Sequence, residues 1–437
     1  MRPSRIVFYG NFGAGNLGNE VTLQTAIEQT LARVPGAELL CVCTNPDDVR
    51  SRHGIEAAPA MSRDSGWSWS DLERTAAAGL GAAQPGGLPA RRSFAAKLKR
   101  LGRILFHRLP RELAHWYQML RLMARSDAFL VPGTGVITDG SCGSLGWPYD
   151  MFKLSVLARL CGKRVIFLSV GAGPFEHRLG SWLIKRSLGF AHYRSYRDAD
   201  SKRRLEEIGF NAAGDRVYPD IVFGLADAHL RGDPRHAAVR RVVGLGLKDY
   251  ATPNDAGDAG RYRDYLGVMA DFVVWLQARG FVVRLIIGDA QYDTRVREDL
   301  IALLKARGAP AMAPGLLSDP VPTVNELLAQ LRGTDAVISP RFHHLVLALM
   351  LNKPVIALSD LPKVDALLSD LGLAQYCLRL ADLSSGNLIS RFGELQARAD
   401  ELKPFIESRM QSYRSALDEQ YQVVLGRLQP AIPAPTR

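Results

Sequence analysis

The chain has 437 residues, of which 47% are hydrophobic and 23% are charged, a balance typical of globular proteins. No apolar run approaches the roughly 18 residues that cross a bilayer, and residues 1–9 lack the hydrophobic region and cleavage site of a signal peptide. The five cysteines are scattered without metal-ligand spacing. We therefore expect a cytoplasmic protein of two domains with reduced thiols and no metal site.

The net charge of +11 is unevenly distributed along the chain. Residues 91–125 hold ten Lys or Arg and one acid, Glu112, and the spacing of Leu98, Leu101 and Leu105 predicts a basic amphipathic helix that ends at Pro110. One interpretation is peripheral contact with the anionic inner face of the cytoplasmic membrane. The alternative is a solvated surface helix. Nucleic acid is not expected, because stacking aromatic residues do not accompany the charge.

The first half of the chain alternates strands and helices, which predicts a doubly wound α/β fold. We expect strands at 6–9, 38–43, 128–131, 165–170 and 194–196, and helices at 20–33, 150–161 and 201–208. Residues 56–90, rich in Ala, Gly and Pro, interrupt the pattern and predict a long loop or lid near an acceptor. A similar unit follows the break near Gly232, with strands at 242–247 and 282–287 and a helix at 261–279.

These patterns divide the chain into three parts. Residues 1–230 form a first domain with a basic insertion at 56–125, residues 231–385 form a second domain, and residues 386–437 form a helical tail across both. Two such units in tandem favour facing domains with a ligand cleft between them.

The first predicted strand leads into a glycine-rich loop. Gly13, Gly15 and Gly18 fit the Gly-x-Gly-x-x-Gly pattern of dinucleotide sites. The strand at 38–43, however, is not followed by the acidic residue that holds a ribose. Asn16, Asn19 and Glu20 add polar groups suited to sugar hydroxyls, although Glu20 also suits the start of a helix.

The second unit places basic groups at the end of a predicted strand. A strand at 336–338, a helix at 343–351 and a strand at 355–358 surround Arg341 and His343. These two residues are expected at a helix N-terminus facing the carboxyl end of a parallel sheet, where anions bind. A guanidinium beside an imidazole suits an acidic substrate that must receive a proton. The alternative is that Arg341 pairs with a carboxylate and one histidine belongs to the core.

Several blocks of the chain together resemble the polysaccharide pyruvyl transferase family. The blocks are Gly13-Ala14-Gly15-Asn16-Leu17-Gly18-Asn19-Glu20, Pro132-Gly133-Thr134 through Asp139, Val170-Gly171-Ala172-Gly173-Pro174, Ser195-Tyr196-Arg197-Asp198, Tyr218-Pro219-Asp220, Ser339-Pro340-Arg341-Phe342-His343 and Leu361-Pro362-Lys363. They span roughly residues 5–375 in the family's order, so the resemblance covers most of the chain. Where the family usually has Asp, this chain has Asn19.

The resemblance implies two facing Rossmann-like domains, similar to the glycosyltransferase B fold. It implies transfer of a pyruvyl group from phosphoenolpyruvate to a sugar of a cell-surface polysaccharide or its lipid-linked precursor, with no metal or cofactor. His343 would be the general acid, and His344 would point elsewhere. The phosphoenolpyruvate-binding residues would be Arg197, Arg341, Ser339 and Lys363. The acceptor-binding residues would be Asn16, Asn19, Glu20, Thr134 and Asp139, and a cap or turn role is an alternative for Asp139.

Two other classes of function remain open. A nucleotide-sugar-dependent glycosyltransferase has the same architecture, and it would need carboxylates near residues 311–325 to hold its donor. A family member that binds glycan or membrane without turnover would not need the Arg341 and His343 pair.

Overall fold

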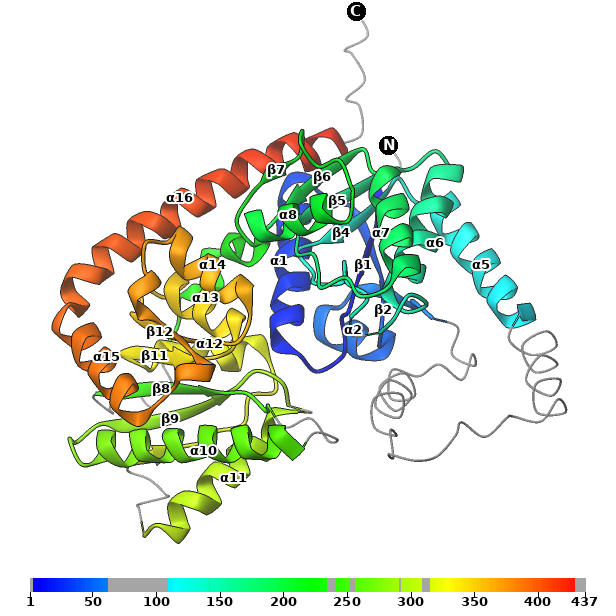
Figure 1. Cartoon of the computed structure of the whole chain (residues 1–437). Coiled ribbons are helices and arrows are strands. Elements are labelled where there is room, and N and C mark those ends of the chain that lie inside the picture. Colours follow the sequence, from blue (N-terminus) through cyan, green and yellow to red (C-terminus); the bar gives the residue numbers. More distant parts are fainter. Residues whose placement is uncertain are drawn as a thin grey trace, which may run out of the picture.

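The computed structural model describes residues 3–61, 109–140, 142–233, 241–250, 256–290, 292–308 and 315–428. The predicted loop beyond residue 61 and the basic amphipathic helix up to residue 108 lie outside these residues. The described residues form two α/β units, each built on a parallel sheet, and Figure 1 shows the two units side by side.

The first unit contains a parallel sheet of seven strands in the order β3-β2-β1-β4-β5-β6-β7. Its strands are β1 (Arg5–Gly10), β2 (Glu38–Cys43), β3 (Glu56–Pro59), β4 (Ala128–Pro132), β5 (Arg164–Val170), β6 (Tyr193–Tyr196) and β7 (Arg216–Val217). The central strands are continuous apolar runs because helices cover both faces of a parallel sheet. The strand order reverses direction between β1 and β4, which is the position where such sheets bind ligands.

The second unit repeats this topology with six strands in the order β10-β9-β8-β11-β12-β13. Its strands are β8 (Val242–Leu247), β9 (Val282–Ile287), β10 (Leu316–Leu317), β11 (Ala336–Ser339), β12 (Val355–Ser359) and β13 (Cys377–Arg379). In this sheet the strand order reverses between β8 and β11, so a ligand is expected at the carboxyl ends of these two strands.

Helices connect the strands of each sheet. Those of the first unit are α1 (Leu17–Arg33), α2 (Pro46–His53), α5 (Leu109–Ala124), α6 (Trp147–Leu160), α7 (Arg178–Gly189), α8 (Ala199–Glu207), η2 (Ile221–Gly224) and α9 (Asp227–Leu230). Those of the second unit and the tail are α10 (Ala256–Gln277), α11 (Asp293–Ala306), α12 (Val324–Arg332), α13 (Phe342–Met350), α14 (Pro362–Asp370), η3 (Ala374–Tyr376), η4 (Leu380–Asp382), α15 (Ser385–Ala397), α16 (Ala399–Leu425) and η5 (Gly426–Leu428).

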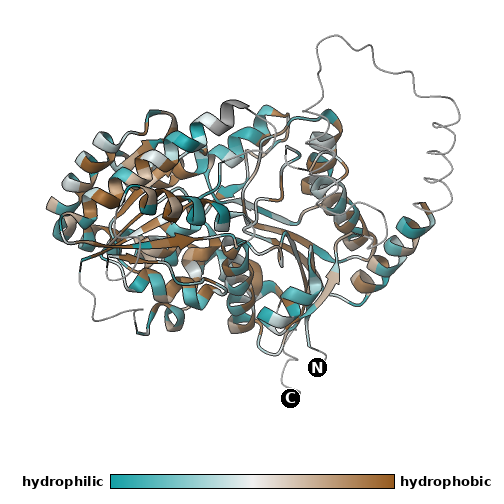
Figure 2. Ribbon diagram, turned by 90° about the horizontal axis from the view of Figure 1, so that it is seen from below, coloured by the Kyte–Doolittle hydropathy of each residue, from teal (hydrophilic) through white to brown (hydrophobic). Residues whose placement is uncertain are grey.

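Buried apolar side chains join the two units. One contiguous cluster extends from Ile6 and Phe8 in the first sheet to Val337 and Ile338 in the second. In Figure 2 the strands are predominantly brown, and the helices around them carry both teal and brown residues. Packing that continues from one unit to the other fixes their relative position more firmly than a polar contact would.

The C-terminal helix α16 contacts both units. It runs for 27 residues along the edge of the molecule in Figure 1. Near its middle, the hydroxyl of Tyr413 donates to Asp370 of the second unit. Near its end, Gln420 donates to Ser195 at 2.6 Å and accepts from Ser169 at 3.0 Å, both in the first unit. The helix therefore connects the two sheets across the side of the cleft.

The predicted strands and helices that fall on described residues are confirmed, with end shifts of a few residues. Pro110, which was predicted to end the basic helix, lies at the start of the described part of α5, and the predicted helix before it lies outside the described residues. None of the described helices is both long enough and apolar enough to cross a bilayer.

Candidate active site

Four basic side chains follow the carboxyl ends of parallel strands. Lys248 comes directly after β8, Arg341 lies two residues after β11, and Lys363 lies in the first turn of α14 after β12. Arg197 comes directly after β6 of the first unit. Because parallel strands end at one edge of each sheet, and the two edges face each other, the topology brings the four cations together.

A small cavity of about 110 Å³ lies between the two units at this edge, and we call it the basic cavity. The first unit contributes the turn at the start of α1, and the second contributes three cations and two histidines. Its polar lining consists of Asn16, Asn19, Lys248, Arg341, His343, His344 and Lys363. The first turn of α13 also opens into it, which adds the partial positive charge of a helix N-terminus. The cavity is therefore strongly favourable for an anion.

Arg341 is held by a buried carboxylate. Its guanidinium pairs with Asp293, which is fully buried and also accepts the backbone N–H groups of Gly288 at 3.2 Å and Asp289 at 3.1 Å. The pairing agrees with the alternative prediction, but Arg341 still lines the cavity. Nε of Arg341 is buried and has no hydrogen-bond partner among the described residues. Asp293 thus fixes the guanidinium while leaving part of it to meet a ligand.

His343 faces the glycine-rich loop across the cleft. A methyl group built on Gly18 would lie 2.1 Å from Nδ1 of His343, so only glycine allows the imidazole to sit there. Nε2 is buried and has no hydrogen-bond partner in the described part of the chain. Burial, followed by the charges of Lys363 and Arg197, holds the pKa of His343 well below its ordinary value. The imidazole is therefore neutral until a negative charge enters the cavity.

Lys363 and Arg197 both lie beside the ring of Phe342. Nζ of Lys363 is 5.5 Å from the ring centroid, and Cζ of Arg197 is 5.3 Å from it. Burial and the nearby charges of Arg197 and Lys248 lower the pKa of Lys363 to about 7. Arg197 from the first unit therefore does reach across to the second, which no local sequence pattern determines.

The loop at the start of α1 contacts the second unit directly. The side chain of Asn16 caps α1 by accepting the N–H of Gly18 at 3.0 Å, and its Nδ2 donates to Asp289 at 3.3 Å. The N–H of Leu17 donates to the carbonyl of Gly288 at 3.0 Å. Nδ2 of Asn19 donates to the carbonyl of Asn11 at 2.9 Å, and Asn19 lines the basic cavity. Asn16 and Asn19 thus lie at the cavity and also hold the loop.

Three predicted acceptor-binding residues do not line the basic cavity, and each is buried. The carboxylate of Glu20 accepts the N–H of Gly13 at 2.9 Å and lies 3.1 Å from Nε2 of His53. The carboxylate of Asp139 accepts the N–H groups of Glu176 at 2.6 Å and His177 at 3.1 Å, so it acts as the cap that was the alternative prediction. Thr134 is 3% exposed. The structure therefore places Glu20, Thr134 and Asp139 outside the lining of the basic cavity, and their contact with an acceptor stays a prediction.

Ser339 and His344 stabilise the turn that carries Arg341 through hydrogen bonds. Oγ of Ser339 accepts the N–H of Arg341 at 3.0 Å and lies 3.1 Å from Nδ1 of His344. Ser339 is fully buried and does not line the cavity. We therefore describe Ser339 as a group that positions Arg341, in place of the predicted contact with phosphoenolpyruvate.

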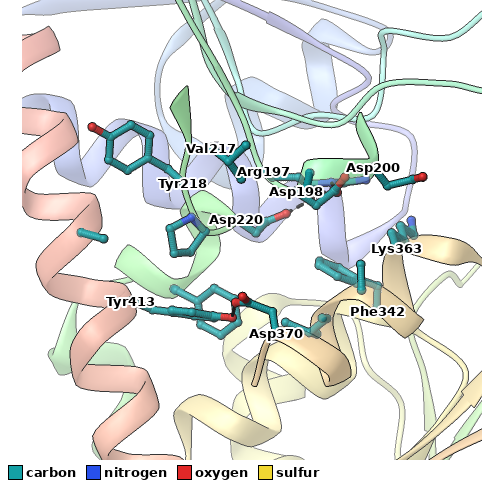
Figure 3. Close-up of a pocket in the computed structure, with 16 residues that line it drawn as sticks. Arg197, Asp198, Asp200, Val217, Tyr218, Asp220, Phe342, Lys363, Asp370 and Tyr413 are labelled. Carbon is teal, nitrogen blue, oxygen red and sulfur yellow. Dashed lines mark hydrogen bonds and ion pairs between the residues drawn. The ribbon is translucent and has the colours of Figure 1, made fainter. Parts of the chain in front are cut away.

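A second cavity of about 380 Å³ adjoins the first, and we call it the larger cavity. It lies among the turn after β6, the segment around η2, and helices α14 and α16. Its polar and aromatic lining consists of Arg197, Asp198, Asp200, Tyr218, Asp220, Phe223, Phe342, Lys363, Asp370 and Tyr413. Phe342 and Lys363 line both cavities. In Figure 3 the carboxylate of Asp220 is directed toward Arg197, and Phe342 and Lys363 lie on one side of the cavity.

A family model described as polysaccharide pyruvyl transferase matches residues 16–360, which include the glycine-rich loop from Asn16 onward, Arg197, Arg341 and His343. The chain belongs to this family. The resemblance seen in the sequence is thereby confirmed. At the level of the family, the chain is a polysaccharide pyruvyl transferase. No curated protein sequence matches the chain significantly.

Solved structures confirm the fold of this pyruvyl transferase. UDP-GlcNAc 2-epimerase from Neisseria meningitidis bound to UDP-GlcNAc is 11% identical, with a TM-score of 0.52 over 96% of this chain and 99% of that one. UDP-GlcNAc 2-epimerase from Methanocaldococcus jannaschii is 10% identical, with a TM-score of 0.51 over 89% and 91%. The N-terminal domain of trehalose-6-phosphate phosphatase from Candida albicans is 11% identical, with a TM-score of 0.54 over 97% of each chain. These likenesses confirm the predicted fold of two parallel-sheet α/β domains, similar to the glycosyltransferase B fold.

Sequence reasoning missed three residues of the pyruvyl transferase's cleft. Lys248 lines the basic cavity and pairs with Asp360. Its place directly after the strand at 242–247 was the available signal, since the same rule identified Arg341. Phe342, which separates the cavities, lies within a quoted motif but carries no charge to mark it. Asp220 also lies in a quoted motif, and it meets Arg197 at 3.4 Å.

Proposed function

We propose that this pyruvyl transferase takes its pyruvyl group from phosphoenolpyruvate and transfers it to two hydroxyls of a sugar, forming a cyclic ketal and releasing phosphate. The observation that carries the proposal is the basic cavity, in which Lys248, Arg341 and Lys363 meet His343. Few small metabolites require that many cations and a proton donor in about 110 Å³. No resident cofactor enters the reaction as proposed.

The charge of phosphoenolpyruvate matches the cations of the cavity. The donor carries a carboxylate and a phosphate, which need at least two cationic partners. Arg341 is anchored by Asp293 and offers a planar fork to one anion. Lys363 and Arg197, which lie 5.5 Å and 5.3 Å from the centroid of the Phe342 ring, are the partners for the other. Lys248 adds a further positive charge at the rim.

His343 is the proposed general acid. Burial and the nearby cations hold the pKa of His343 low, and the negative charges of the donor offset the effect of the cations, which favours the protonated imidazole. Its proton goes to the methylene carbon, the adjacent carbon becomes electrophilic, and one sugar oxygen bonds to it. The second sugar oxygen then replaces the phosphate. Of the two hydroxyl protons, one restores His343 and the other leaves with the phosphate, so atoms and charges balance.

A nucleotide-sugar donor fits the cleft less well. Ligand cavities for larger molecules usually occupy roughly 300–1,000 Å³, whereas the basic cavity has about 110 Å³. Such a donor would extend into the larger cavity, where Asp198, Asp200 and Asp370 would oppose its diphosphate. The carboxylate of Asp319, in the region where a sugar-nucleotide site was expected, pairs with Arg284 at 2.8 Å.

We further propose that the acceptor is a cell-surface polysaccharide or its lipid-linked precursor and that the enzyme works at the inner face of the cytoplasmic membrane. The support is α5, where Leu113 is 59% exposed and Tyr117 is 60% exposed on one face of the helix. Sedimentation of the enzyme with anionic vesicles, but not with neutral vesicles, tests the membrane contact. Loss of sedimentation in a Leu113→Ser and Tyr117→Ser variant would locate it on α5.

The donor is tested by phosphate release from phosphoenolpyruvate in the presence of pooled sugar acceptors. We expect acceptor-dependent release by the native enzyme and its loss in His343→Ala and Arg341→Ala. Lys305→Ala is the matched control, because Lys305 is exposed on α11 and outside both cavities. Binding of a nucleotide sugar without any release of phosphate from phosphoenolpyruvate would refute the proposed donor.

A further inference from the structure

The larger cavity has a defined polar and aromatic lining and lies next to the proposed donor site. Its volume of about 380 Å³ lies within the roughly 300–1,000 Å³ typical of ligand cavities. Its walls come from both units and from α16, so it forms only in the complete fold. Because Phe342 and Lys363 line both cavities, a ligand in the larger cavity would be separated from the donor by the thickness of one side chain.

The two cavities differ in the chemistry of their walls. The basic cavity has no carboxylate among its lining residues. The larger cavity has four carboxylates, those of Asp198, Asp200, Asp220 and Asp370, against the two cations Arg197 and Lys363, together with Tyr218 and Tyr413. Carboxylates accept hydrogen bonds from hydroxyls and repel phosphates, and aromatic rings pack against apolar faces. The larger cavity therefore suits a neutral polyhydroxylated ring rather than a second anion.

Asp220 and Arg197 line the larger cavity, and Arg197 lies beside Phe342, which lines both cavities. The side chain of Asp220 is almost completely buried, and its carboxylate accepts the N–H of Val222 at 3.0 Å and contacts Arg197 at 3.4 Å. Nε of Arg197 is buried and makes no hydrogen bond among the described residues, although it lies 3.4 Å from Asp198. Asp220, which lines the larger cavity beside Arg197, is a carboxylate that a hydroxyl held in this cavity can meet (Figure 3).

We propose that the larger cavity is the acceptor subsite, which holds a neutral sugar unit with its reacting hydroxyls beside Asp220 and Phe342. The inference rests on the proposed function for its donor. It places the acceptor away from Glu20 and Asp139, which line neither cavity, and on the opposite side of Phe342 from the donor. Asp220 orients the hydroxyl that faces the donor.

The test fills the cavity from the α16 wall. Ala416 lines the larger cavity and is partly exposed, whereas its neighbour Ser415 is exposed and outside the cavity. Ala416→Trp is compared with the control Ser415→Trp. The probes are methyl glycosides of neutral hexoses and N-acetylhexosamines, followed by saturation-transfer NMR in the presence of phosphoenolpyruvate. We expect at least a tenfold loss of the signal in Ala416→Trp and none in the control.

A second variant keeps the test informative if Ala416→Trp does not fold. Val217→Trp fills the cavity from β7, where Val217 is 44% exposed and tolerates a larger side chain. Equal glycoside signals from the native enzyme and both filled variants would overturn the proposal. So would the absence of a signal from every probe with the native enzyme.

Calorimetry with phosphoenolpyruvate alone separates this proposal from the proposed function. We expect both filled variants to bind the donor within about twofold of the native enzyme, since neither residue lines the basic cavity. Donor binding that survives while glycoside signals are unaffected by filling refutes the acceptor subsite only. Glycoside signals that disappear on filling while the native enzyme binds no phosphoenolpyruvate refute the donor only.

Discussion

Donor binding should protonate Lys363, and the structure gives the expected number of protons taken up at each pH. Burial, Arg197 and Lys248 lower the pKa of this amine to about 7, so it is mostly neutral above pH 7 and mostly charged below. A bound anion favours the charged form. If the donor restores the ordinary pKa near 10.4, Lys363 takes up about 0.1 proton at pH 6, 0.5 at pH 7 and 0.9 at pH 8. Donor affinity should then fall about fivefold between pH 7 and pH 8 and about tenfold from pH 8 to pH 9.

Calorimetry at each pH, in two buffers of different ionisation enthalpy, measures the number of protons taken up. Subtracting the value for Lys363→Met removes protons taken up by His343 and by the donor phosphate. Lys305→Met, at an exposed position on α11, controls for the loss of a positive charge elsewhere. Equal proton uptake by the native enzyme and Lys363→Met at pH 8 would refute the reasoning. A donor affinity that stays constant above pH 7 would also refute it.

Three substitutions test other parts of the cleft. Gly18→Ala should abolish most turnover without lowering Tm, because the added methyl would lie 2.1 Å from Nδ1 of His343; kinetics and a thermal melt check both. Arg341→Lys should weaken donor binding about 10- to 100-fold by calorimetry, since charge-assisted hydrogen bonds contribute roughly 1.5–3 kcal/mol, and unchanged affinity would contradict the assigned role. Asp139→Asn should lower the free energy of unfolding in urea by about 1–3 kcal/mol and leave both KM values unchanged, because its carboxylate accepts two backbone N–H groups; an altered acceptor KM alone would restore the acceptor role.

Much of the fold could be predicted because its determinants are local. The strand runs at 38–43, 242–247 and 282–287 match β2, β8 and β9 at both ends. The grouping of Arg341 and Lys363 follows from topology, since β11 and β12 are adjacent parallel strands that end at the same edge. The hydrophobic pattern of the sequence and the topology of the sheet are sufficient to predict these features.

The roles of individual polar residues could not be predicted in the same way. Glu20 is buried because His53, 33 positions away, meets its carboxylate, and Asp139 is buried because the backbone at Glu176 returns to it. These partners are set by tertiary packing, which leaves no periodic signal in the sequence. The place of Arg197 depends on the angle between the units, which the shared core and α16 fix.

The backbone contact between the two units has a kinetic consequence. Leu17 donates its N–H to the carbonyl of Gly288, and Asn16 forms a bridge with Asp289 at the mouth of the basic cavity. Any rotation that widens this mouth must break these bonds, while α16 on the far side keeps the units attached and acts as the pivot. In the proposed reaction, entry of the donor and escape of phosphate would both require these few bonds to break, so the opening rate would set an upper limit on turnover.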